Sequence, residues 1–267
     1  MLSHISTRLE AILALVLVLF AALFVARITE HICRRIEWKP RLGLTLILSI
    51  LSLPGLLYCL YYLHLLPEME WFYQLRSLRG SELWLAIPLS AVVAWSNFAT
   101  RPFVLFFYAL AVGALVVPFA KPLSRPLDPV EFRDQWNGNA CLQSTESTCG
   151  PASAATVIRY LGKKGVTETS LAINAKSTTS GTEAWYLARE LRRRGYVAEF
   201  QFNSFPNKIS FPGILGVRLG TLGHFIAVLK HEGDQWTIAD PLVGQEIVTL
   251  QELKRRYSIS GFFLHIH

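Results

Sequence analysis

Long apolar stretches in the first 120 residues restrict the possible folds of this chain more than any other feature. Four such stretches cover residues 9–28, 42–66, 83–99 and 102–120. A helix that crosses a bilayer needs about 20 apolar residues, and helices in soluble cores rarely present such a run. The third stretch is the shortest and contains Pro88, Ser96 and Asn97. The sequence therefore predicts a membrane domain over residues 1–120 with four transmembrane helices.

The basic residues between these stretches predict how the chain is oriented. The first loop, residues 27–41, contains five basic and two acidic residues, and the third contains Arg101. The second loop, residues 67–82, contains two basic and three acidic residues. Because basic loops stay in the cytoplasm, loops one and three are predicted there and loop two outside. Four crossings then place the C-terminal part on the extracytoplasmic side of a multi-pass membrane protein.

Net charge gives little indication of a soluble partner. The total of +7 divides into +3 over residues 1–119 and +4 over the remainder. The basic residues are spread out and are not interleaved with aromatic residues as in nucleic-acid-binding surfaces. No nucleic-acid partner is predicted, and the lipid bilayer, with anionic headgroups near loop one, is the simpler partner.

The second half of the chain has the composition of a globular domain. Residues 121–136 contain three prolines and are predicted to form a linker. Helical patterns follow first, and strand-like runs come after them, at 196–202, 213–219, 224–231, 235–239, 246–249 and 261–266. This order predicts an α+β domain over residues 137–267.

A cysteine at the start of a predicted helix is the first candidate for chemistry. Cys149 precedes Gly150 and Pro151, and an alanine-rich run then continues to Gly162. Proline in the first turn and glycine just after the last turn are typical of the two ends of a helix. The N–H groups and the dipole at a helix N-terminus stabilise a thiolate. Gln143 could donate a hydrogen bond beside it. A lone cysteine in an alanine-rich helix is usually a small buried apolar residue, so Cys149 by itself does not indicate catalysis.

Thiol catalysis also needs a base and a group that orients it. His224 begins a predicted strand after Gly223, and Asp240 ends the next strand before Pro241. A short turn between the two strands would make a hairpin and place His224 beside Asp240. Taken singly, a histidine at a strand edge and an aspartate at a turn are ordinary structural residues.

Together these residues show a family resemblance. Gln143, Cys149-Gly150-Pro151, Gly223-His224-Phe225 and Asp240-Pro241 resemble, in order and spacing, the bacteriocin-processing, double-glycine leader peptidase family. That family is a branch of the papain-like cysteine peptidases. The resemblance covers residues of about 135 to 267. It implies a papain-like fold, Cys149 as nucleophile, His224 as general base and acid, Asp240 as the group that orients the imidazole, and Gln143 as oxyanion donor.

The resemblance also implies a function and a location. The expected activity is a membrane-anchored cysteine endopeptidase that cleaves a peptide or secreted protein near the bilayer, at a double-glycine or small-residue site. A bacterial plasma membrane and a transporter or secretion partner are implied as well. The chain has no G-x-x-x-x-G-K-[ST] phosphate loop, so it is not itself the ATP-driven exporter.

Two other functions stay open at this point. An amine in place of water would make the same thiol an amidase or transpeptidase, and a domain without activity could bind peptides for a transporter. No cofactor is predicted, and no metal site, because Cys149 and His224 lack the spacing of a zinc ligand set. Cys141 would share a compartment with Cys149, so a regulatory disulfide between them also stays open.

Overall fold

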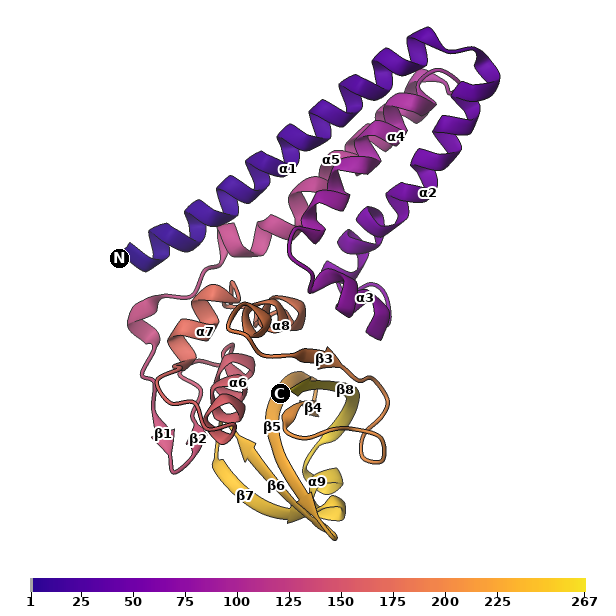
Figure 1. Ribbon diagram of the computed structural model, residues 1–267. Helices are drawn as coiled ribbons and strands as arrows, with labels where there is room; N and C mark the ends of the chain where they lie inside the picture. Colours follow the sequence, from indigo (N-terminus) through magenta and orange to yellow (C-terminus); the bar gives the residue numbers. More distant parts are fainter. Residues whose placement is uncertain (1) are drawn as a thin grey trace. The chain divides into compact units, whose positions relative to one another are not determined.

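The computed structural model describes residues 2–267, with side chains from residue 8 onward. The described chain is divided into two compact units, which are coloured along the sequence in Figure 1. Arg8–Glu68 and Leu78–Ser124 form the apolar unit. Met69–Ser77 and Arg125–His267 belong to the second unit, called the C-terminal unit here.

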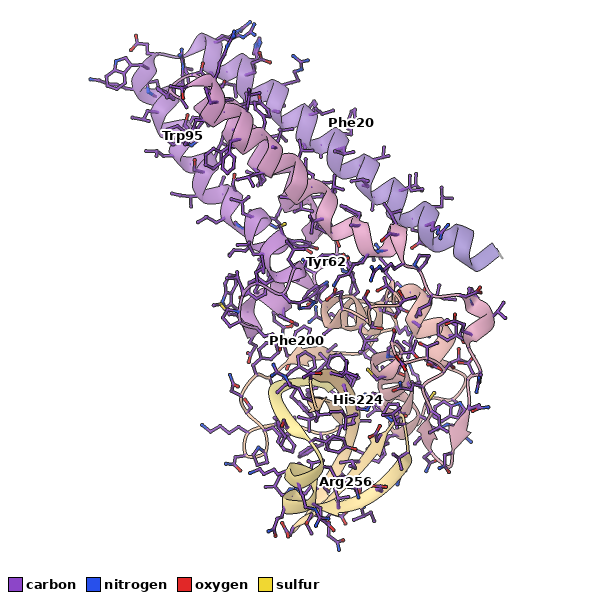
Figure 2. All side chains as sticks on the ribbon, turned by 180° about the vertical axis from the view of Figure 1, so that it is seen from behind. Phe20, Tyr62, Trp95, Phe200, His224 and Arg256 are labelled. Atoms are coloured by element: carbon purple, nitrogen blue, oxygen red, sulfur yellow. The ribbon has the colours of Figure 1, made fainter. Side chains whose placement is uncertain are left out.

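Helices make up the apolar unit. They are α1 (Leu2–Arg35), α2 (Trp38–Tyr62), the 3₁₀ helix η1 (Ser81–Ala86), α4 (Ile87–Trp95) and α5 (Arg101–Ser124). Large apolar side chains point outward, as Figure 2 shows for Phe20, which is 69% exposed. Ile50 and Leu105 are exposed to a similar degree. Soluble monomers rarely expose an apolar surface of this extent, so the outer face of these helices is suited to contact with lipid.

Within the described residues, three helices are long and apolar enough to cross a membrane: Arg8–Arg35, Trp38–Tyr62 and Arg101–Ser124. The predicted third span, residues 83–99, forms the shorter apolar helix Ser81–Trp95. It is shorter because the chain leaves the helix in the turn after Trp95, where Ser96 and Asn97 bond to carbonyls of the preceding turn. The number of crossings therefore stays a prediction.

The C-terminal unit is α+β, which confirms the predicted fold class. Its helical part contains α3 (Glu70–Arg76), η2 (Pro129–Glu131), α6 (Cys149–Tyr160), α7 (Glu168–Asn174), α8 (Ala184–Arg193) and α9 (Leu250–Arg256). A short pair of strands, β1 (Trp136–Asn137) and β2 (Ala140–Cys141), precedes α6.

A six-stranded sheet forms the other layer, with the order β3-β8-β4-β5-β6-β7. The strands are β3 (Ala198–Phe200), β4 (Gly213–Leu219), β5 (Leu222–Glu232), β6 (Gln235–Asp240), β7 (Gly244–Thr249) and β8 (Ser258–Ile266). All neighbouring pairs are antiparallel. Leu215, Ile226 and Phe263 are fully buried in its core. Helix α6 lies against the sheet (Figure 1), so the start of α6 and the start of β5 come together.

The boundaries of the units differ from the predicted domains 1–120 and 137–267. Helix α5 continues to Ser124, so the predicted linker 121–136 starts inside a helix. The segment Met69–Ser77, predicted as part of the membrane domain, packs within the C-terminal unit. The reason is that Phe72, Tyr73 and Arg76 are buried there.

Candidate active site

Cys149 is the first residue of α6, as the positions of Pro151 and Gly162 predict. The N-cap residue Thr148 makes no side-chain cap to the helix, and its hydroxyl oxygen instead accepts a hydrogen bond from the Thr145 N–H at 3.1 Å. The first turn of α6 is therefore left without a side-chain cap. Such N–H groups can bind negative charge. Cys149 itself is nearly buried, with 9% of its surface exposed.

A direct bond fixes α6 against the strand that carries His224. The Ser153 hydroxyl, about one turn after Cys149, donates to the carbonyl of Phe225 at 3.0 Å. Gly150 lies beside the same strand, where an added Cβ would be in van der Waals contact with the Phe225 ring at 3.4 Å. Sequence reasoning predicts both elements but not this bond, which sets the position of the thiol relative to the imidazole.

His224 forms a hydrogen bond with Asp240 and lies near Cys149. Its Nε2 lies 2.8 Å from the Asp240 Oδ1, and both side chains are buried. Cys149 lies near enough to His224 to raise the pKa of the imidazole. His224 is labelled in Figure 2, within the C-terminal unit. The hairpin of β5 and β6 brings the histidine and the aspartate together, as the short connection between the two strands predicts.

The surroundings favour the charged form of this imidazole. Burial alone would lower the pKa of His224, but the hydrogen bond to Asp240 and the nearby Cys149 outweigh it and raise the pKa to about 9. His224 is therefore an imidazolium at neutral pH in the folded protein. An imidazolium beside a thiol stabilises the thiolate, and it can later return a proton.

Asp240 is held as an anion by three donors. Its Oδ1 also accepts the Leu242 N–H at 2.8 Å, and its Oδ2 accepts the Tyr257 hydroxyl at 2.5 Å. Burial would raise the pKa of Asp240, but these hydrogen bonds and the one from His224 hold it below its usual value. Burial and the bond to Asp240 raise the pKa of Tyr257 in turn, so its hydroxyl stays a donor.

Gln143 lies in the loop before α6 and is tied to the aspartate turn. Its backbone N–H donates to the Pro241 carbonyl at 3.0 Å, directly after Asp240. Its side-chain Nε2 donates to the Thr145 carbonyl at 2.8 Å. An amide nitrogen has two N–H groups, so one is left for a substrate oxygen. The structure thus connects Gln143 to the same turn as Asp240.

A buried carboxyl group, which sequence reasoning missed, holds this loop. Glu168 in α7 is fully buried and accepts bonds from the Ser144 N–H at 2.7 Å and the Ser144 hydroxyl at 2.5 Å. Burial raises the pKa of Glu168, and the bonds from Ser144 oppose that rise. Ser144 directly follows Gln143, so Glu168 orders the segment that carries the predicted oxyanion donor.

Cys141 has a different environment from Cys149. It is buried, and its backbone N–H donates to the Thr156 hydroxyl of α6 at 2.8 Å. Burial, together with the nearby carboxylates of Glu168 and Asp134, raises the pKa of the Cys141 thiol to about 12. Both cysteines are present as free thiols. The possibility of a regulatory disulfide between them is not tested by this structure, and Cys141 has the surroundings of an inert thiol.

Comparison with known proteins identifies the class. Residues 137–267 match the model of the peptidase C39 family. An uncharacterized protein of Methanothermobacter thermautotrophicus is 31% identical over 122 residues, which cover 44% of this chain and 81% of that protein. A second, from Methanothermobacter marburgensis, is 34% identical over 107 residues, which cover 39% and 71%. This chain is a cysteine peptidase. Residues 137–267 belong to the peptidase C39 family.

Solved structures resemble the C-terminal unit as well. One is a double glycine motif protease from an AMS/PCAT transporter in complex with the leader peptide, 23% identical, with a TM-score of 0.42; the match covers 53% of this chain and 96% of that one. Another is the peptidase domain of Streptococcus ComA, a bi-functional ABC transporter of a quorum-sensing pathway. It is 21% identical with a TM-score of 0.40, and the match covers 47% and 94%.

Proposed function

We propose that Cys149, His224 and Asp240 form the catalytic triad of a membrane-anchored endopeptidase, with Gln143 as oxyanion donor. The observation that carries the proposal is the buried hydrogen bond between His224 and Asp240, with Cys149 near enough to His224 to raise the pKa of its imidazole. It connects a nucleophile, a base and an orienting carboxylate in the order that thiol catalysis needs.

Each residue has a defined step in this mechanism. The Cys149 thiolate attacks the carbonyl carbon of the scissile peptide, and the oxygen takes the negative charge. The Gln143 amide and the backbone N–H of Cys149 stabilise that oxyanion. The His224 imidazolium donates its proton to the leaving amine, and a thioester to Cys149 forms. His224 then takes a proton from the water that attacks the thioester, and the acid is released together with the Cys149 thiolate, which restores the starting ion pair.

The surroundings of the triad favour a peptide with apolar side chains. Leu222, two residues before His224, is 72% exposed, and Leu242 and Val243, directly after the Asp240 turn, are each 54% exposed. Exposed apolar residues beside a catalytic group provide contact area for a substrate chain. Together with the family membership, they support cleavage of a peptide or secreted protein after a double-glycine or small-residue site.

The apolar unit supports the membrane location. Its three long helices are suited to a bilayer by length and composition, and the excess of basic residues in loop one favours a cytoplasmic position for that loop. The enzyme would thus act on substrates close to the membrane. A transporter or secretion component is the kind of partner that would deliver them.

A synthetic peptide with an internal Gly-Gly pair, incubated with the detergent-solubilised full chain, tests this function. We expect two fragments whose masses add up to the substrate plus one water, cut after the second glycine. A matched peptide with valine at that position should be cleaved at least about tenfold more slowly, because a hydrophobic pocket distinguishes a few methylene groups by about 10- to 200-fold. Fragments that carry the mass of an added amine would instead identify a transferase, and equal cleavage of both peptides would contradict the small-residue specificity.

A further inference from the structure

Helix α3 lies in the loop between two apolar helices, yet it is built into the C-terminal unit. Tyr73 is 4% exposed and inserts among aromatic rings of that unit. Its ring centroid lies 5.0 Å from that of Trp185, 5.1 Å from that of Phe202 and 5.4 Å from that of Phe200. Aromatic pairs at these separations contribute beyond their buried area. Figure 1 shows α3 beside α8 and β3, the elements that carry these rings.

Polar contacts fix the same helix at both ends. The Glu70 carboxylate at its start accepts the Phe202 N–H at 2.8 Å. At its end, Arg189 donates to the Arg76 carbonyl at 2.8 Å, and Arg192 donates to Gln74 at 2.8 Å and to the Ser77 hydroxyl. The Arg76 guanidinium is fully buried and lies 4.3 Å from the Trp185 ring centroid.

The aromatic cluster continues toward the triad. Phe262 of β8 lies 6.2 Å from Tyr73 and 5.1 Å from Phe225, measured between ring centroids. Phe225 directly follows His224 and accepts the bond from Ser153 of α6. Helix α3 therefore packs, through Phe262, against the strand that carries His224.

We infer that α3 is an integral part of the peptidase fold, which requires the loop that contains it and the C-terminal unit to lie on the same side of the membrane. This inference rests on the proposed membrane location. Between Ser77 and Arg125 the chain leaves the C-terminal unit and returns to it. A return to the same side needs an even number of crossings. Because α5 is a full-length candidate span, η1 and α4 together must cross as well.

The dimensions allow this crossing. Six residues of 3₁₀ helix rise about 12 Å and nine residues of α-helix about 13.5 Å, given rises of about 2.0 and 1.5 Å per residue. The sum of about 26 Å is slightly less than the hydrocarbon core of about 30 Å, and bilayers adapt to such a mismatch at modest cost. The chain thus crosses four times. The C-terminal unit is connected to the membrane helices by the chain before α3, by the chain after α3, and at Arg125.

Labelling of introduced cysteines in spheroplasts that contain the full chain tests the topology. The exposed positions are Lys39 in loop one, Arg79 in loop two, Thr100 in loop three and Asp234 on the C-terminal unit. With a membrane-impermeant maleimide and peptide mapping by mass spectrometry, we expect Arg79→Cys and Asp234→Cys to be labelled from one side, and Lys39→Cys and Thr100→Cys only after the membrane is opened. Labelling of Arg79→Cys and Asp234→Cys from opposite sides would overturn the inference. This readout needs no activity, so it is independent of the proposed function.

A matched pair of variants tests the docking of α3. Tyr73→Ala removes the buried ring, whereas Trp71→Ala on the same helix removes a ring that is 54% exposed. We expect Tyr73→Ala to lower the unfolding temperature of the C-terminal unit by about 6 to 12 °C and Trp71→Ala to change it by less than about 2 °C. Equal effects of the two substitutions would show that α3 does not contribute to the peptidase fold.

Discussion

Replacement of Cys149 by alanine in the full-length protein is expected to abolish peptide cleavage. The nucleophile forms the thioester, and without it only the oxyanion donors and substrate binding act on the peptide. In enzymes with such a triad, loss of the nucleophile lowers kcat by on the order of 10⁴-fold or more. The measurement is kcat and KM for a cleavable peptide in detergent, and we expect KM to change little because binding does not depend on the thiol.

Cys141→Ala provides the matched control for this prediction. It removes the other buried cysteine of the same unit, which lies on β2 and has a thiol pKa of about 12. We expect that variant to retain cleavage within about threefold, because its thiol takes part in no step of the mechanism. Loss of activity in both variants would point to a packing role for the two cysteines. Full activity of Cys149→Ala would exclude the proposed nucleophile.

Gln143→Ala is expected to lower kcat by about two to three orders of magnitude with a smaller change in KM. Removal of one oxyanion donor typically has this effect, because the hydrogen bond strengthens only as negative charge develops on the substrate oxygen. Gln143→Glu should be at least as inactive, since a carboxylate next to the oxyanion repels it. Kinetics of both variants with one peptide check the prediction.

An exposed glutamine serves as the control for these substitutions. Gln251 lies on the surface of α9, and Gln251→Ala should leave kcat unchanged. The backbone bond of Gln143 to Pro241 does not depend on the side chain, so the alanine variant should keep its fold and unfold at nearly the wild-type temperature. An alanine variant that retains more than about a third of wild-type kcat would contradict the oxyanion role.

Local patterns predict much of the fold and of the site. The positions of Pro151 and Gly162 predict the helix that begins at Cys149, and the observed α6 ends two residues before Gly162. The six strand-like runs correspond to β3 to β8. The short connection between β5 and β6 predicts that His224 and Asp240 are neighbours, because adjacent antiparallel strands pair in register from their turn.

The residues that sequence reasoning missed depend on contacts between distant segments. Tyr257 bonds to Asp240 only because β7 and α9 return the chain to the aspartate turn. Glu168 has no local signal either, because its partner Ser144 lies 24 positions earlier. Helix α3 has the composition of an interfacial loop, and its burial depends on rings more than 100 residues later in the chain. The third apolar stretch forms a shorter helix than its apolar length predicts, because polar residues follow Trp95, and its crossing of the membrane stays a prediction.

The central claim is that Cys149 and His224 form an activated pair, and the pH dependence of Cys149 alkylation tests it most directly. The full-length protein in detergent would be treated with iodoacetamide between pH 5 and 10, beside a His224→Ala variant, and the modified peptide quantified by mass spectrometry. An isolated thiol with a pKa of about 8.5 is only about 0.3% thiolate at pH 6. The imidazolium of His224, with a pKa of about 9, persists across the range from pH 6 to 8.

We therefore expect wild-type Cys149 to react at pH 6 at a rate close to its rate at pH 8. In the His224→Ala variant, the rate should fall about tenfold for each pH unit below 8 and be on the order of 100-fold below wild type at pH 6. If the wild-type rate instead falls with pH in the same way as that of the variant, His224 does not activate Cys149, and the proposed catalytic triad is wrong.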